Sequence, residues 1–154
     1  MRLLFASFSL LVVVAVGCAN GGESTPSRDH QPQQASKTGS VADDYPKLIQ
    51  HLRAAGAEPV SGGSVEQPFF SITGTIIKVH GEDVQVFQYA DTGAAEAAAA
   101  PISRDGMAVG TRKIFWVGPP HFFKQGRLLV LYVGDNVKVL GTLAAVLGRQ
   151  FAGR

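Results

Sequence analysis

The side chains able to act as nucleophiles, bases or metal ligands are few and widely spaced. The chain has one cysteine, Cys18, and four histidines: His30, His51, His80 and His121. No pair of histidines has HxH or HxxxH spacing, and no serine lies in a GxSxG or SxxK motif. Glycine-rich phosphate-binding motifs are missing as well. The sequence leaves enzymatic activity open but favours a protein without it, so we assign no catalytic residue, cofactor or metal.

The carboxylates give a weak signal for chemistry because turns or helix caps account for them. These residues are Glu82, Asp83, Asp91, Asp105 and Asp135. A hydrolase that pairs two carboxylates from distant positions stays an alternative. His80 and His121 both fall at expected hairpin connections, where a histidine–carboxylate metal site is conceivable, but the spacing typical of such sites is missing.

The most unusual stretch runs from residue 116 to 124, with the sequence WVGPPHFFK. It contains the only tryptophan, and basic residues flank it. One interpretation is structural: the prolines set a wide turn, and the aromatic rings pack beneath it. The other is an exposed aromatic and basic surface that contacts lipid headgroups, a glycan or a protein. The residues of this candidate interaction surface are Trp116, Pro119, Pro120, His121 and Phe122.

The first 17 residues have the layout of an export signal. Arg2 precedes an apolar run from residue 3 to 16 that only two serines interrupt. A helix of that length spans about 21 Å, which is short of the roughly 30 Å hydrocarbon core of a bilayer. The run ends in the small residues of VAVGC, so cleavage before Cys18 is expected.

The segment VAVGC resembles the lipobox of bacterial lipoproteins, with Ala15 where the family prefers leucine. The resemblance implies a diacylglyceryl thioether on Cys18, cleavage after Gly17, and a fatty acid such as palmitate on the new amino group. More than one acyl chain makes membrane attachment stable. A lipidated Cys18 would leave no thiol for a disulfide or for redox chemistry.

Residues 18–42 are expected to form the lipidated end and a disordered tether. Glycine, serine, proline and glutamine dominate there, and no aromatic residue is present. Such a tether reaches about 25–30 Å by random-coil scaling. The net charge of +2 is too balanced to indicate a nucleic-acid-binding protein.

Residues 43–154 are expected to form a single α+β domain. Asp43-Asp44 and Pro46 indicate a helix start, and Gly56 indicates its end. Strands are expected at 69–79 and 84–89, then a helix at 94–100 capped by Asp91. A second pair of strands follows at 112–117 and 128–133, then a last helix capped by Asp135. This order, α-ββα-ββα, predicts a mainly antiparallel sheet of about four strands with helices packed on it. The fully apolar segment 128–133 should be its central strand, covered on both faces.

The carboxyl-terminal 80 or so residues resemble small bacterial lipoproteins of unknown role. The resemblance rests on VQVFQYADTGAAEAAAAPISRDG, on IFWVGPPHFFKQGRLLVLYVGDN and on LGRQFAG, and it implies no activity or ligand. The sequence therefore predicts a lipid-anchored protein on the extracytoplasmic side of a cell membrane, the inner or the outer one. Its domain is expected to be a non-enzymatic interaction module with an envelope protein or a glycan as partner. The alternative is a small envelope hydrolase or a ligand-carrying pocket protein.

Overall fold

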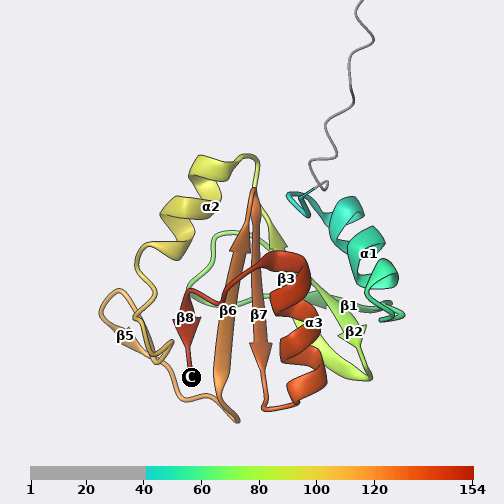
Figure 1. Cartoon of the computed structure of the whole chain (residues 1–154). Helices are drawn as coiled ribbons and strands as arrows, with labels where there is room; N and C mark the ends of the chain where they lie inside the picture. Colours follow the sequence, from blue (N-terminus) through green and yellow to red (C-terminus); the bar gives the residue numbers. More distant parts are fainter. Residues whose placement is uncertain (1–40) are drawn as a thin grey trace, which may run out of the picture. The chain divides into compact units, whose positions relative to one another are not determined.

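The structure is a computed structural model and describes residues 41–154 (Figure 1). The predicted signal segment, Cys18 and nearly all of the predicted tether lie outside the described residues. Within residues 41–154, no helix has both the length and the apolar character that crossing a membrane requires.

The described residues form an α+β domain with a mainly antiparallel sheet, as predicted. The helices are α1 (Tyr45–Ala54), α2 (Thr92–Ala99) and α3 (Val137–Leu147). The large sheet has six antiparallel strands, in the spatial order β1 (Val60–Val65), β2 (Gly74–Val79), β3 (Glu82–Gln88), β7 (Leu128–Val133), β6 (Pro120–Gln125) and β8 (Ala152–Gly153). A separate hairpin joins β4 (Ala108–Val109) to β5 (Arg112–Lys113).

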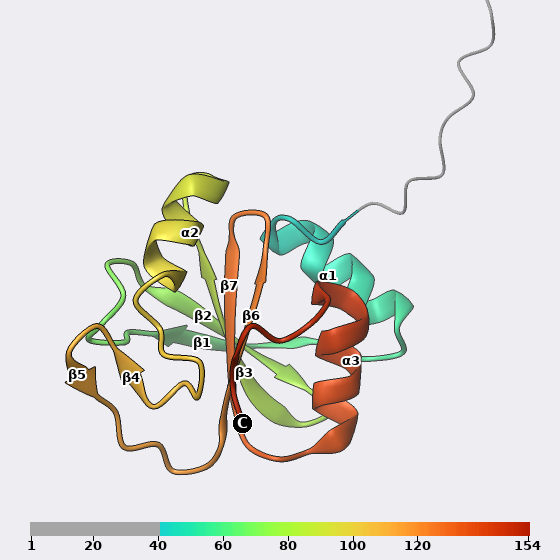
Figure 2. The same cartoon turned by 60° about the vertical axis from the view of Figure 1, so that its left-hand side comes forward.

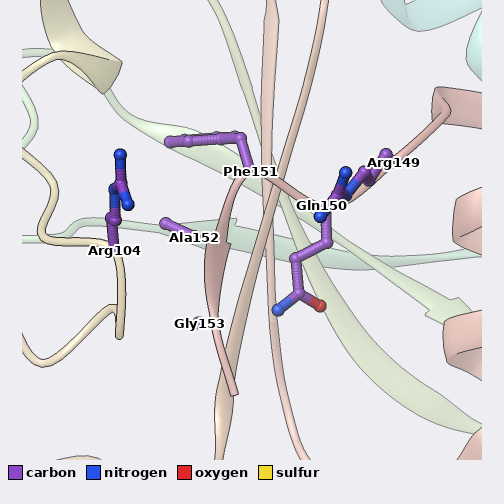
Figure 3. Close-up of a pocket in the computed structure, with 6 residues that line it drawn as sticks. All are labelled: Arg104, Arg149, Gln150, Phe151, Ala152 and Gly153. Carbon is purple, nitrogen blue, oxygen red and sulfur yellow. The ribbon is translucent and has the colours of Figure 1, made fainter.

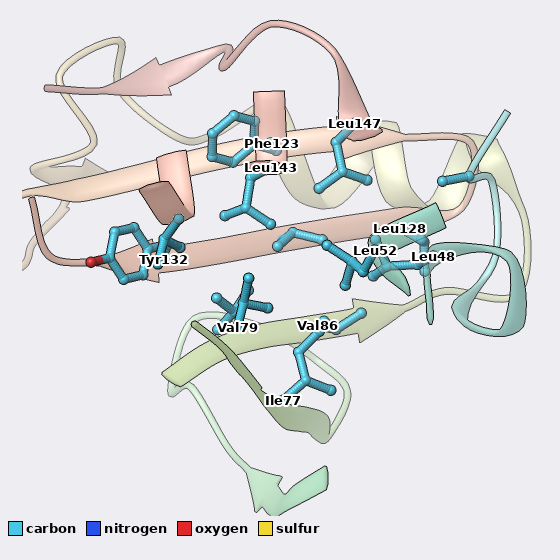
Figure 4. Packing of buried hydrophobic residues seen from close by; sticks show 14 of the residues in the cluster. Leu48, Leu52, Ile77, Val79, Val86, Phe123, Leu128, Tyr132, Leu143 and Leu147 are labelled. Carbon is cyan, nitrogen blue, oxygen red and sulfur yellow. The ribbon is translucent and has the colours of Figure 1, made fainter. Parts of the chain in front are cut away.

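Strand β7 is the central strand, and both of its faces are covered. Because side chains alternate along a strand, Val130 enters one apolar cluster while Leu131 enters another. Helices α1 and α3 cover the first face with leucines such as Leu48 and Leu143 (Figure 4). Helix α2 and the β4–β5 hairpin lie on the other face (Figure 2). The prediction of a central strand buried on both faces is confirmed.

Local capping chemistry explains where two of the helices begin. The side chain of Asp44 accepts a hydrogen bond from the Lys47 amide at 3.0 Å, and Asp91 caps α2 through the Ala94 amide at 2.8 Å. The predicted cap of the last helix was wrong by one residue. Asn136, rather than Asp135, accepts from the Lys138 amide.

The first hairpin was predicted correctly, but its boundaries differ. Strand β2 begins at Gly74 rather than at residue 69, and only His80 and Gly81 separate it from β3. Both turn residues have positive φ, at 51° and 85°, as a two-residue turn between twisted strands requires. Phe69 and Phe70 lie in the preceding loop, where their rings meet edge to face.

Strand β1 was missed because its sequence, VSGGSV, lacks the side chains that indicate a strand. It is an edge strand with an irregular register at Ser61–Gly63. A side chain at Gly62 would come within 2.8 Å of Ile76 on β2, so the close approach of these strands requires glycine. The short edge strand β8 was missed as well.

The prediction for the second strand pair was wrong in its first member. Within the expected strand 112–117, only Arg112 and Lys113 pair, and they pair with β4. The partner of β7 is β6, which begins at Pro120. A proline is tolerated at the first residue of a strand. His121 and Phe122 therefore belong to a strand rather than to a wide turn.

Ala42, which the predicted boundary at 43 assigns to the tether, packs with the domain. Ala42 is fully buried in the cluster beneath α1. The carbonyl of Asp43 accepts from the Arg127 amide at 3.1 Å, beside the β6–β7 turn. The start of the described chain is thus fixed at this end of the central hairpin (Figure 1).

Candidate functional site

The most exposed large apolar side chains of the described residues lie in the segment between β5 and β6. We call residues 112–118 the apolar loop. Phe115 is 91% exposed and Val117 is 103% exposed, whereas Ile114 and Trp116 are partly buried. This alternation is that of an extended chain with one side on the protein and the other in solvent. Neighbouring exposed apolar side chains on a well-packed domain indicate a contact surface.

Trp116 holds the apolar loop in place. Its indole nitrogen donates to the Gly106 carbonyl at 2.8 Å. Its ring meets Phe69 at 5.9 Å and Phe122 at 6.0 Å, both edge to face. Aromatic contacts of this geometry stabilise beyond the area that they bury. Because Trp116 is fixed from three sides, the side chains on either side of it are directed outward.

The root of the apolar loop is basic. Arg112 and Lys113 are exposed, and neither belongs to any ion pair formed within residues 41–154. Arginine and lysine at the rim of an apolar contact favour a partner with complementary negative charge. The loop therefore combines two projecting apolar side chains with two cations that have no counter-charge in the described domain.

The apolar loop lies at the opposite end of the central hairpin from the start of the domain. Gly118 packs against Gly134, which lies just beyond the far end of β7. A Cβ atom at Gly118 would lie 3.7 Å from the Cα of Gly134. Asp43 packs beside the β6–β7 turn, where Gly126 leaves room for it. The six-residue strands between them span about 17 Å. The loop thus points away from the end where the predicted tether joins the domain.

The residues predicted as the interaction surface do not form one exposed surface. Phe122 is fully buried, His121 is 5% exposed, and Pro120 is buried as well. Trp116 and Pro119 are partly buried. The neighbouring residues Phe115 and Val117 were missed. All four residues from Ile114 to Val117 are apolar, so the sequence does not show which of them face solvent.

His121 belongs to a buried polar cluster beneath α3. Its Nδ1 lies 2.7 Å from Oε1 of Gln150, its ring stacks on Tyr132 with centroids 6.0 Å apart, and its Nε2 is buried without a hydrogen-bond partner. Since an amide oxygen can only accept, Nδ1 is the donor of this bond. Within residues 41–154, no carboxylate bonds to the ring, so the arrangement differs from a nucleophile–base pair.

Tyr132 connects this cluster to a carboxylate. Its hydroxyl donates to Glu82 at 3.1 Å and accepts from the Asn136 amide at 3.1 Å, while the Asn136 side chain donates to the other Glu82 oxygen. Burial raises the pKa of Tyr132, and the hydrogen bond to Glu82 raises it further. These bonds tie β3 to the start of α3, so we interpret them as structural.

His80 and His121 do not share a site. His80 lies at the exposed β2–β3 turn, where its Nε2 is 2.9 Å from the hydroxyl of Thr142 on α3. In the part of the chain that the structure describes, no three histidine, cysteine, aspartate or glutamate side chains gather closely enough to hold a metal ion.

Comparisons with protein-family models, with curated proteins and with solved structures found no significant match to this chain.

Proposed function

We propose that this chain is a lipid-anchored protein on the extracytoplasmic side of a bacterial cell membrane. In this proposal its domain binds another envelope protein without catalysing a reaction. The anchor is proposed from the sequence, in which Cys18 directly follows an export signal. The interaction is proposed from one structural observation: Phe115 and Val117 project into solvent from a loop that Trp116 holds in place.

The chemistry of the apolar loop favours a protein as its partner. A projecting aromatic side chain fits a concave apolar pocket, and aromatic anchors in such pockets dominate many protein interfaces. Arg112 and Lys113 favour an acidic rim around that pocket.

A hydrolase is the weaker candidate. Among residues 41–154, a hollow next to β8 is lined by arginine, glutamine and apolar residues and by no carboxylate. The hydrolase alternative would need an acid or a base at a site that substrate can reach.

The anchor is tested by replacing Cys18 with serine in the full chain. Cells are labelled with a palmitate analogue and fractionated. We expect label and membrane attachment in the wild type and the loss of both in Cys18→Ser. A wild type that is membrane-bound but carries no label would contradict the anchor.

The interaction is tested by placing a photoreactive phenylalanine analogue at Phe115 of the full chain. The matched control carries the same analogue at Gln50, which is exposed on α1. We expect one crosslinked protein from position 115, none from position 50, and loss of that product when Arg112 and Lys113 are both changed to glutamate. Crosslinks to lipid alone, or equal products from both positions, would overturn the choice of surface.

A further inference from the structure

A second site lies beside the edge strand β8, away from the apolar loop. Residues Arg104, Arg149, Gln150, Phe151, Ala152 and Gly153 line a hollow of about 470 Å³ (Figure 3). This volume lies within the range of small-molecule sites. Figure 3 shows Arg104 on one side of β8 and Arg149 on the other, with Phe151 between them.

The charge of this hollow is positive and uncompensated. Neither Arg104 nor Arg149 joins an ion pair within residues 41–154, where the paired cations are Lys47, Lys78, Lys124 and Arg127. A guanidinium group keeps its charge at any physiological pH and offers five donors. Two such groups with no counter-charge would favour the binding of an anion in this hollow.

The nearest carboxylate in sequence, that of Asp105, is used within its own loop. It accepts from the Ser103 hydroxyl at 2.6 Å and from the Met107 amide at 3.0 Å. These two bonds lower the pKa of Asp105, and the charge of Arg154 lowers it further. Asp105 therefore stays ionised and bonded to its loop, and it is not among the residues that line the hollow.

Gln150 adds a third donor. Its Oε1 accepts a hydrogen bond from His121 Nδ1 at 2.7 Å. The His121 ring is fixed because it is buried and stacked on Tyr132. The amide nitrogen of Gln150 is thus left to donate to a ligand. The polar side chains of the hollow are all donors, which matches a ligand rich in acceptor oxygens.

The floor of the hollow is rigid. The Phe151 amide donates to the Phe122 carbonyl at 3.0 Å, and the Gly153 amide donates to the Arg104 carbonyl at 2.9 Å. Gly153 has a φ of 113°, and a side chain there would overlap the Pro120 carbonyl. These bonds fix the backbones of the two arginine-bearing segments relative to each other, so ordering them on binding costs little.

We infer that this hollow binds a small organic anion whose carboxylate or phosphate group is attracted by the charges of Arg104 and Arg149 and accepts a hydrogen bond from Gln150. The apolar body of the ligand would lie against the ring of Phe151. This inference does not depend on the apolar loop or on the lipid anchor.

The test is titration of the ¹⁵N-labelled full chain in detergent micelles with glycerol phosphate and with glucuronate. Glycerol and glucose are the matched neutral probes. We expect shifts of the Phe151, Ala152 and Gly153 amides with at least one anion and with neither neutral compound. Arg104→Gln and Arg149→Gln should each weaken binding by about tenfold, the value of one charge-assisted hydrogen bond. Arg53→Gln, exposed on α1, should leave the affinity unchanged.

The two anions distinguish a phosphate site from a carboxylate site, and either result supports the inference. Unchanged amide resonances elsewhere in the spectra of the variants would show that they remain folded. The inference is overturned if neither anion shifts these amides, or if glycerol and glucose shift them equally. An equal loss of affinity in Arg53→Gln would overturn it as well, since that result indicates nonspecific charge attraction.

Discussion

The indole nitrogen of Trp116 donates to the carbonyl oxygen of Gly106 at 2.8 Å, and this bond joins the apolar loop to the turn before β4. Gly106 is buried, so its carbonyl has no ready replacement by water once the indole is removed. The pairing explains how the apolar loop, which forms no strand after Lys113, keeps Phe115 and Val117 directed outward.

The first prediction concerns Trp116→Phe, which keeps an aromatic ring but removes the donor. We expect the free energy of unfolding to fall by about 1–2 kcal/mol, because the Gly106 carbonyl loses its partner. Urea denaturation followed by far-ultraviolet circular dichroism measures this change without relying on tryptophan emission. Phe115→Leu, next along the chain, is the control and should be neutral. Equal midpoints for wild type and Trp116→Phe would show that the bond contributes nothing to stability.

The second prediction separates contact from folding. Phe115→Ser combined with Val117→Ser removes the two exposed apolar side chains, so the free energy of unfolding should change by no more than about 0.5 kcal/mol. The double variant should nevertheless no longer bind the partner that crosslinking identifies. Urea denaturation and a pull-down on the same preparation check both parts. A large loss of stability would mean that these side chains pack against the domain, contrary to their exposure.

Helix α1, the β2–β3 hairpin and β7 could be predicted from the sequence because local chemistry determines them. Asp44 and Pro46 specify a helix start, and the apolar run 128–133 indicates a central strand in any register. These features need no information from distant residues.

The segment before β7 could not be predicted in this way. Arg112–Val117 has a better strand composition than Pro120–Gln125, whose first residue is a proline. Tertiary packing decides which segment pairs with β7. In β6, Phe122 and Phe123 enter the two apolar clusters on opposite faces of the sheet. Similarly, contacts with Phe69, far earlier in the chain, determine that Trp116 faces the protein and Phe115 does not.

The third prediction compares two buried tyrosines at neutral pH. The Tyr132 hydroxyl bonds to Glu82 and Asn136, whereas the Tyr89 hydroxyl is buried without a partner. Tyr132→Phe should lower the free energy of unfolding by about 1–2 kcal/mol, and Tyr89→Phe should leave it unchanged or raise it slightly. Urea denaturation of the two variants side by side checks the sign. If Tyr89→Phe were the more destabilising, the Tyr89 hydroxyl would have to bond to an ordered water.

The fourth prediction concerns alkaline pH. Burial raises the pKa of both Tyr89 and Tyr132 above the ordinary value of about 10. Between the unfolded and the folded pKa, the unfolded chain ionises first, so the free energy of unfolding falls as the pH rises above about 10. Wild type should therefore lose stability more steeply between roughly pH 9 and 11 than the Tyr89→Phe/Tyr132→Phe double variant. Urea denaturation across that range measures both slopes, and parallel slopes would contradict the raised pKa values.

The fifth prediction concerns the residue at which the folded domain begins. Ala42 is fully buried beneath α1, whereas Val41 next to it is 47% exposed. Ala42→Asp places an unpaired carboxylate in the apolar cluster, so it should lower the free energy of unfolding by about 3 kcal/mol or more. Val41→Asp adds the same charge one residue away and should change it by no more than about 0.5 kcal/mol. Urea denaturation of the two full-length variants provides a comparison matched in charge and position. Equal stabilities would place the boundary at residue 43, as the composition predicts. A large difference would mean that Ala42 belongs to the core of the domain and not to the predicted tether.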